Sequence, residues 1–275
     1  MYVYYRIVWT EGIKMTDFSQ LENYLEVETE KYNQNDLLSL NHYIHQYVSH
    51  VPFENINVQN KQPIALNDEA MLHKIIQEHR GGFCYEQNRL FKNYLVGKGF
   101  DVELISATIN TGDGWAMIGS HMALKVTINQ QNYLVDVGYA DVPKEAMPLS
   151  DPQEVISDIN GYFKASYIDT QTIEMCKYKD GGWQIQYRAM DVPKTISDFE
   201  AGITYNQHNP SSIFVKKLIV SKATDTGRIT LSNSHLTITE HGEKVKKTVT
   251  SDNYLAILDD YFGIDNINIL TFERS

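Results

Sequence analysis

The most informative stretch of this sequence is Arg80-Gly81-Gly82-Phe83-Cys84-Tyr85-Glu86-Gln87-Asn88, which places one cysteine on a glycine-rich turn. Apolar and aromatic side chains then recur about every 3.6 residues between Tyr85 and Val96, which predicts a helix that Gly97 ends. Cys84 should lie in the first turn of that helix, where unpaired backbone N–H groups and the helix dipole favour an anion such as a thiolate. Cys84 is therefore a candidate nucleophile, although a buried cysteine in a helix-packing turn fits the local pattern equally well.

A nucleophilic thiol needs a base, and the base needs a group that orients it. His121 opens a predicted strand, 121–128, and Asp136 lies near the end of a second predicted strand, 133–137. Because only a short polar turn separates the strands, they should pair as a hairpin, with His121 and Asp136 facing each other across the ladder. An imidazole N–H would also offset the cost of burying the Asp136 carboxylate among apolar neighbours. The sequence therefore predicts a Cys/His/Asp arrangement.

With these residues in place, the chain resembles the arylamine N-acetyltransferases, cysteine enzymes that depend on acetyl-CoA. The matching blocks follow the family's order over roughly residues 20 to 262. They are Val51-Pro52-Phe53-Glu54-Asn55, Arg80 to Asn88, His121 to Leu124, Val135 to Tyr139, His208 to Phe214 and Gly227 to Leu231.

The resemblance implies an α+β fold with a cysteine-proteinase-like arrangement: an N-terminal helical bundle, an antiparallel β-barrel and a C-terminal α/β lid. The expected divisions are an N-terminal extension at 1–14, a helical domain with the nucleophile at 15–100, a barrel with the histidine and aspartate at 101–200, and a lid at 201–275. Met15 is an alternative to Met1 as the start of translation.

The residue pattern predicts particular elements within these divisions. Capping residues and apolar periodicity predict helices from Asp17 to Tyr32, from Asp36 to Ser49 and from Asp68 to His79. Alternating patterns and turn residues predict the later strands. These are 102–108, 121–128, 133–137, 183–188, 214–220, 228–231, 235–239 and 245–249, followed by a helix at 252–262.

The resemblance further implies transfer of an acetyl group from acetyl-CoA, as co-substrate, to an arylamine or arylhydrazine. Cys84 would carry the acetyl group in a ping-pong mechanism, His121 would handle the proton, and Asp136 would fix the imidazole. Expected amine-binding residues are Phe53, Tyr139 and Phe214; expected coenzyme A contacts are Gly138, Thr111, Gly112 and Gly114. Plain core packing is the alternative for the aromatic residues, and an ordinary turn is the alternative for 111–114.

Two departures from the family pattern stand out. The segment Tyr24-Leu25-Glu26-Val27-Glu28 lacks the arginine that often follows the Tyr-Leu pair of the first helix. Gly138-Tyr139-Ala140 replaces the common Gly-Phe-Gly, which bears on the shape of the acceptor pocket. We also expect Arg80 and Glu54 to pair and hold the signature turn, the alternative being two solvated surface charges.

Composition narrows the class of protein. The formal net charge of −11 over 275 residues argues against a nucleic-acid or anionic-membrane surface. Only Cys84 and Cys176 are present, which predicts no disulfide framework and a reducing, cytoplasmic compartment. The sequence shows no signal peptide and no apolar run long enough for a membrane span. Histidine spacing predicts no metal site, and nothing in the sequence predicts the oligomeric state.

Three other functions use the same residues. A cysteine protease or transglutaminase-like hydrolase would need no coenzyme A. An amide synthase of the same family would use Cys84 with a larger acyl donor. A catalytically silent relative would bind arylamines or coenzyme A without turnover. The favoured interpretation remains an acetyltransferase of xenobiotic metabolism, as the resemblance implies.

Overall fold

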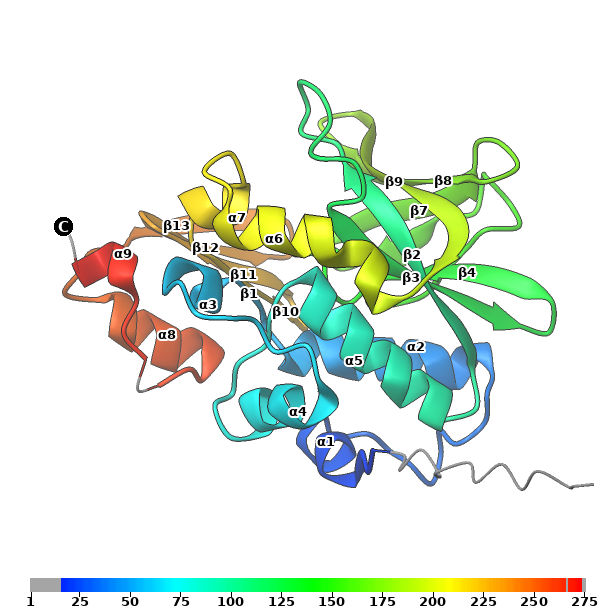
Figure 1. Ribbon diagram of the computed structural model, residues 1–275, viewed down its shortest axis with the longest axis horizontal. Coiled ribbons are helices and arrows are strands. Elements are labelled where there is room, and N and C mark those ends of the chain that lie inside the picture. The colour runs from blue at the N-terminus through cyan, green and yellow to red at the C-terminus, as the bar shows by residue number, and fades with distance from the viewer. Residues whose placement is uncertain (1–15, 266, 274–275) are drawn as a thin grey trace, which may run out of the picture.

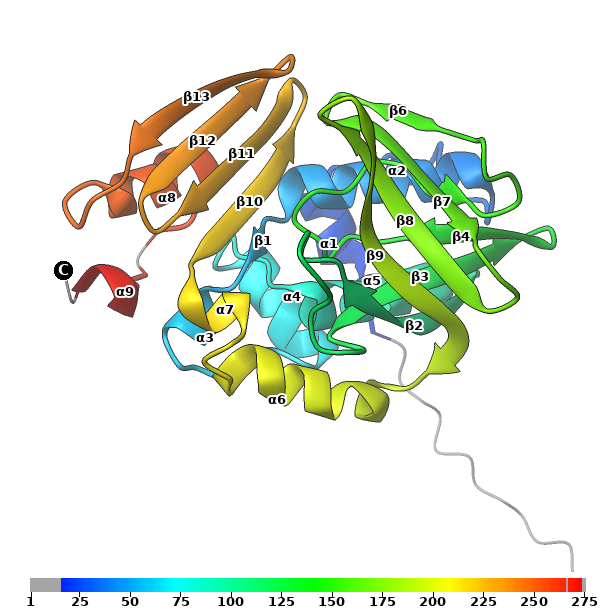
Figure 2. The same ribbon diagram turned by 90° about the horizontal axis from the view of Figure 1, so that it is seen from above.

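The computed structural model describes residues 16–265 and 267–273. Two β-sheets lie at opposite sides of the molecule, and helices occupy the space between and beneath them (Figures 1 and 2). The expected extension at 1–14 and the alternative start at Met15 lie outside the described residues.

Five helices precede the first long strand, and two of them begin as the capping pattern predicts. They are α1 Ser19–Tyr24, α2 Leu37–His50, α3 Ile56–Gln59, α4 Asp68–Ile76 and α5 Cys84–Gly97. The Asp36 side chain accepts a hydrogen bond from the Ser39 N–H at 2.8 Å and caps α2. Asn67 caps α4 in the same way through the Ala70 N–H.

The predicted extents of two helices are wrong at their C-terminal ends. The first was expected to run to Tyr32, but α1 stops at Tyr24 because Glu26 takes a left-handed backbone conformation at φ +56°. The third was expected to reach His79, but α4 stops at Ile76, and His79 is also left-handed at φ +52°. Neither of these left-handed residues is a glycine, so the sequence contained no clear signal for the end of either helix.

Eight antiparallel strands form a nearly closed barrel in the order β5-β4-β3-β2-β9-β8-β7-β6. They are β2 Asp101–Ile109, β3 His121–Ile128, β4 Gln131–Val135, β5 Met147–Pro148, β6 Ile156–Asp158, β7 Gly161–Tyr167, β8 Thr172–Lys179 and β9 Gly182–Lys194. Helix α5 packs against β2 and β3, and buries Leu90, Phe91 and Leu95 in the central core. The barrel therefore packs directly against the helix that Cys84 begins.

The second sheet has the order β1-β10-β11-β12-β13. Its strands are β1 Phe53–Glu54, β10 Ile219–Thr224, β11 Gly227–Ser232, β12 His235–Glu240 and β13 Glu243–Thr248. Strand β1 comes from the N-terminal helical part and pairs with β10, Phe53 opposite Ser221. This pairing fixes the C-terminal sheet to the segment that precedes Cys84.

The remaining helices precede β10 or follow β13 in the chain. They are the 3₁₀ helix η1 Ile196–Phe199, α6 Glu200–His208, α7 Ile213–Lys216, α8 Tyr254–Phe262 and α9 Leu270–Glu273. The strand predicted at 214–220 is wrong from residue 214 to residue 218. The Ser212 hydroxyl accepts a hydrogen bond from the Phe214 N–H and starts α7, so extended structure begins only at Ile219.

Buried charges support the turn before α5. Lys74 Nζ lies 3.0 Å from Glu54 Oε1 and 2.9 Å from Glu86 Oε1, and Arg80 Nη2 lies 2.9 Å from Glu54 Oε1. Burial raises the pKa of Glu54, but the Arg80 and Lys74 cations outweigh it and lower that pKa below its usual value. Burial raises the pKa of Glu86 more than Lys74 lowers it. The expected Arg80–Glu54 pair is thus confirmed, and Lys74 is a second cation that the sequence analysis did not identify.

The glycines of the signature turn have no room for a side chain. A Cβ at Gly81 would lie 1.8 Å from the Pro52 carbonyl oxygen, whereas a Cβ at Gly182, the first residue of β9, would meet nothing within 4 Å. We expect Gly81→Ala to lower the free energy of unfolding by about 3 kcal/mol, because backbone must shift. Gly182→Ala should change it by no more than about 0.5 kcal/mol. Urea denaturation measures both, and equal effects would contradict the account of the turn.

Candidate active site

Three separate elements bring Cys84, His121 and Asp136 together. Cys84 is the first residue of α5, His121 is the first residue of β3, and Asp136 directly follows β4. All three are buried, with exposed fractions of 2%, 3% and 3%. His121 Nε2 lies 2.7 Å from Asp136 Oδ2, within hydrogen-bond distance. With Nε2 bound to the carboxylate, Nδ1 is the ring nitrogen left for the neighbouring Cys84 thiol.

The hairpin is present, but His121 and Asp136 do not face each other across it as predicted. The β3–β4 ladder runs from Ile128 opposite Gln131 to Leu124 opposite Val135 and ends there. Continued in that register, Asp136 would lie opposite Ala123, so His121 is its diagonal neighbour on the same face. The carboxylate reaches the imidazole because Asp136 lies beyond the last ladder pair.

Asn88 holds the aspartate in place. Its Nδ2 donates to Asp136 Oδ1 at 2.8 Å and to the Met122 carbonyl at 2.7 Å. Its Oδ1 accepts the Val137 N–H at 2.9 Å. Asn88 stands four residues after Cys84 on the same face of α5, and this helical spacing is the signal that could have revealed its role.

The charge on His121 follows from these contacts. Burial alone would lower the pKa of His121, but the Asp136 carboxylate and the Cys84 sulfur outweigh burial and raise it to about 10. The imidazole is therefore an imidazolium at neutral pH. The Tyr187 and Tyr139 rings enclose it, with ring centroids 5.1 and 5.7 Å from that of His121.

Gly138 allows the barrel to approach the nucleophile closely. A Cβ at this position would lie 2.6 Å from Cys84 Cα and 2.7 Å from Asn88 Nδ2. The Gly138 N–H also donates to Asp136 Oδ1 at 2.9 Å. A glycine here brings the backbone after Asp136 against the first turn of α5.

A cavity of about 490 Å³ opens beside the three residues. Five expected binding residues line it: Phe53, Thr111, Gly138, Tyr139 and Phe214. The other lining residues include four side chains that the sequence analysis did not select, namely Trp115, Tyr205, Asn206 and Ser212.

Two of the expected coenzyme A contacts lie away from this cavity. Gly112 and Gly114 do not line it and belong to an exposed tight turn, closed by the Thr111 N–H donating to the Gly114 carbonyl at 2.9 Å. The structure therefore brings only Thr111 of that loop to the cavity.

Comparison with known proteins agrees with this geometry. The N-acetyltransferase family model matches residues 36–269, most of the chain. The chain belongs to the arylamine N-acetyltransferase family. As a member of this family, it is an acyltransferase.

Individual relatives have low sequence identity to this chain but match most of its length. The uncharacterized acetyltransferase YvcN of Bacillus subtilis (strain 168) is 31% identical over 202 residues, 72% of this chain and 79% of that protein. Human arylamine N-acetyltransferase 1 is 26% identical over 271 residues, 89% of this chain and 93% of that one. The (BACCR)NAT3 arylamine N-acetyltransferase of Bacillus cereus is 29% identical, with a TM-score of 0.82, covering 92% of this chain and all of that one.

The predicted fold class is confirmed by these comparisons: helices, a nearly closed antiparallel barrel and a further sheet form the cysteine-proteinase-like fold of the arylamine N-acetyltransferases. The Bacillus cereus structure is described as having a unique Cys-His-Glu catalytic triad. In this arylamine N-acetyltransferase family member the acid bound to His121 is Asp136, which Asn88 holds.

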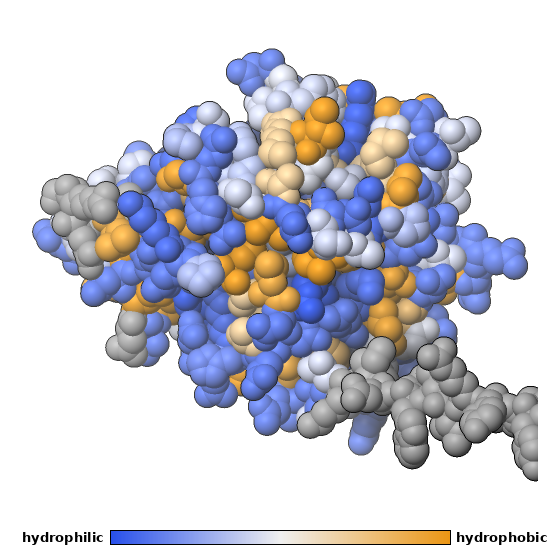
Figure 3. Space-filling model, in the orientation of Figure 1, coloured by the Kyte–Doolittle hydropathy of each residue, from blue (hydrophilic) through white to orange (hydrophobic). Residues whose placement is uncertain are grey.

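Apolar side chains border the cavity on the molecular surface. Trp115 and Ile213, which line it, are half-exposed, and nearby Ile118 in the β2–β3 loop is almost fully exposed. Figure 3 shows apolar surface around α6 and at the β2–β3 loop, between hydrophilic regions. The Arg188 guanidinium lies 5.0 Å from the Trp115 ring.

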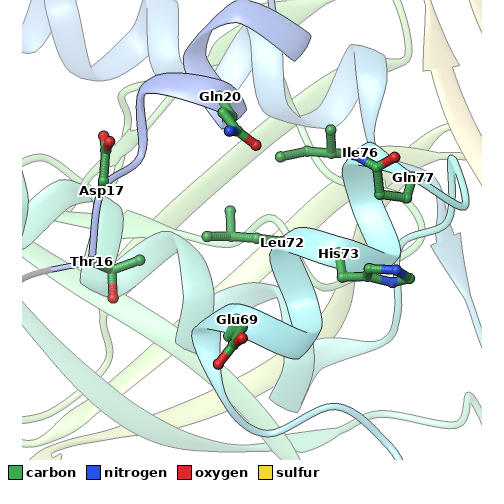
Figure 4. Close-up of a pocket in the computed structure, with 8 residues that line it drawn as sticks. All are labelled: Thr16, Asp17, Gln20, Glu69, Leu72, His73, Ile76 and Gln77. Carbon is green, nitrogen blue, oxygen red and sulfur yellow. The ribbon is translucent and has the colours of Figure 1, made fainter.

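A second hollow, of about 520 Å³, lies between α1 and α4 (Figure 4). Its walls combine Asp17 and Glu69 with Leu72 and His73, and no cysteine lines it. Among residues 16–265 and 267–273, no group of His, Cys, Asp and Glu is arranged to hold a metal ion. No helix within those residues is both long and apolar enough to cross a bilayer.

The two thiols have different surroundings. Burial, reinforced by Glu174, raises the pKa of Cys176 to about 11, so this thiol stays protonated at neutral pH. Cys84 instead lies beside the His121 imidazolium and at a helix N-terminus. Alkylation at neutral pH should therefore select Cys84.

Replacing Asp136 by asparagine tests this electrostatic account. Asp136→Asn removes the carboxylate that raises the pKa of His121, so the imidazolium beside Cys84 is lost at lower pH. We expect iodoacetamide alkylation of Cys84 at pH 7 to slow by about tenfold or more. The control is Asp252→Asn, at an exposed carboxylate before α8, which should leave the rate unchanged. An unaltered rate in Asp136→Asn would show that Asp136 does not govern the thiol.

Proposed function

We propose that this protein transfers an acetyl group from acetyl-CoA to an arylamine or arylhydrazine through an acetyl-Cys84 intermediate. The observation that supports this most directly is the Cys84–His121–Asp136 arrangement at a cavity with aromatic walls. Membership of the arylamine N-acetyltransferase family supports the same reaction class. Metabolism of foreign amines is the corresponding proposed role.

The first half-reaction acetylates the enzyme. The Cys84 thiolate attacks the carbonyl carbon of the acetyl thioester, and the backbone N–H of Cys84 in the first turn of α5 is our candidate donor to the oxyanion. The C–S bond to coenzyme A then breaks. The departing coenzyme A thiolate takes a proton from the His121 imidazolium, which leaves acetyl-Cys84 and a neutral imidazole.

The second half-reaction regenerates the thiolate. The amine nitrogen attacks the acetyl-Cys84 carbonyl, and neutral His121 accepts the proton that the nitrogen loses. When the C–S bond breaks, Cys84 leaves as a thiolate beside the restored imidazolium. Asp136 keeps Nε2 bound, so Nδ1 remains directed to the sulfur throughout.

Both substrates would use the same cavity in turn. Phe53 and Phe214 have ring centroids 6.0 Å apart, and Tyr139 lies against His121, so a flat aromatic amine has rings to pack against. Gly138 and Thr111 are the proposed contacts for the approach of coenzyme A. A reducing, cytoplasmic location is proposed because both cysteines are free thiols.

Intact mass spectrometry tests the intermediate. The protein incubated with acetyl-CoA alone should gain one acetyl group, which an added arylamine such as p-toluidine should remove as the acetylated amine. Cys84→Ala should gain none and lose all turnover, because it lacks the nucleophile. Cys176→Ala should behave as wild type, since Cys176 lies in β8 and does not line the cavity.

Other outcomes would identify the alternatives. No adduct from acetyl-CoA, together with rapid alkylation of Cys84 by iodoacetamide, would contradict the acetyltransferase and favour another acyl donor or a hydrolase. No adduct and an unreactive thiol would favour a silent binding protein.

A further inference from the structure

The backbone after Asp136 forms one wall of the cavity. Gly138, Tyr139, Ala140 and Asp141 all line it, and this stretch follows the last ladder residue of β4. It forms part of no helix or strand of its own, so its position depends on side chains that bind its carbonyl groups.

Arg228, in strand β11 of the C-terminal sheet, binds two of these carbonyl groups. Its Nη1 donates to the Ala140 carbonyl, and its Nη2 donates to the Val142 carbonyl at 3.2 Å. Its Nε lies 3.5 Å from Asp141 Oδ1. The Arg228 side chain is 13% exposed, so it holds the wall from a largely buried position.

Two further side chains act on the same stretch. Ser221 Oγ, in β10, donates to the Ala140 carbonyl at 3.3 Å. Lys177 Nζ, in barrel strand β8, binds both Asp141 carboxylate oxygens, at 2.7 and 2.6 Å. The C-terminal sheet therefore holds the backbone of this wall, while the barrel holds the Asp141 side chain.

We propose that Arg228 is a positioning residue for acyl transfer to the amine: it fixes the Tyr139–Val142 part of the wall against which the acceptor lies. This inference rests on the proposed function. Without Arg228, the Ala140 and Val142 carbonyl groups lose their charged donor, and the segment carrying Tyr139 shifts relative to acetyl-Cys84.

The catalytic residues themselves do not depend on Arg228. Asp136 is held by Asn88 and by the Gly138 N–H, and His121 is held by Asp136. Arg228 contacts none of these three side chains in the hydrogen bonds and ion pairs of the described residues. Loss of Arg228 should therefore affect the amine step and leave the reactivity of the thiol intact.

Ping-pong kinetics separate these two effects, because kcat/KM for the amine reports only the second half-reaction. For Arg228→Met we expect kcat/KM for p-toluidine to fall about tenfold, since small displacements of a positioned reactant are costly. The rate constant for iodoacetamide alkylation of Cys84 should stay within about twofold of wild type. Arg228→Lys should recover part of the loss, because an ammonium can donate to one carbonyl but not span both.

Ser221→Ala supplies a second, milder variant, with a smaller fall in kcat/KM for the amine. Because Ser221 and Arg228 donate to the same carbonyl, the double variant should lose less than the product of the two single effects. Arg89→Met is the matched control: it removes a partly buried arginine of α5 that pairs with Asp68 at 2.8 Å and does not line the cavity, and it should not change the amine kinetics.

An alkylation rate that falls in parallel with the amine kinetics would overturn the proposal, since Arg228 would then support the whole site. Unchanged amine kinetics in Arg228→Met would overturn it as well. If Arg228→Met does not fold, the amine kinetics of Ser221→Ala decide. Wild-type protein that transfers no acetyl group to p-toluidine would instead count against the proposed function.

Discussion

The Asn88 carboxamide joins α5 to strand β3, which His121 begins, and to the segment after β4 that contains Asp136. Both N–H groups of its amide donate, to Met122 and Asp136, and its oxygen accepts from Val137. One buried side chain thus fixes a helix against a β-hairpin. Aspartate could not replace it, because a carboxylate has no N–H to donate to the Asp136 carboxylate.

Other parts of the fold hold the segments that surround this contact. The cluster of Glu54, Lys74, Arg80 and Glu86 holds the turn that leads into Cys84, and removing Lys74 would leave the buried Glu86 without its cation. Pairing of β1 with β10 connects that turn to the C-terminal sheet. From the same sheet, Arg228 donates to the Ala140 carbonyl in the cavity wall that follows Asp136. The helical part, the barrel and the second sheet each contribute residues that form or support one cavity.

Local signals in the sequence were sufficient where the physics is local. The cap at Asp36, the start of α4 at Asp68, the period of α5 and the hairpin that begins at His121 were all readable because neighbouring residues determine them. Left-handed Glu26 and His79 are not glycines and were missed; the short helix that Ser212 caps was also missed, although its cap is local. Lys74 and Arg228 were missed because their partners lie far away in sequence, and a charged residue usually lies at the surface.

The central claim is that Asp136, held by Asn88, keeps His121 charged beside Cys84. Folding raises the pKa of His121 from 6.5 to about 10, so this group stabilises the fold fully below about pH 6.5 and loses that contribution as pH rises through about 10. An NMR titration of histidine-labelled protein, with His121→Gln to assign the signal, measures this directly. We predict that the His121 ring stays charged well above pH 8; titration near pH 6.5 would contradict the account.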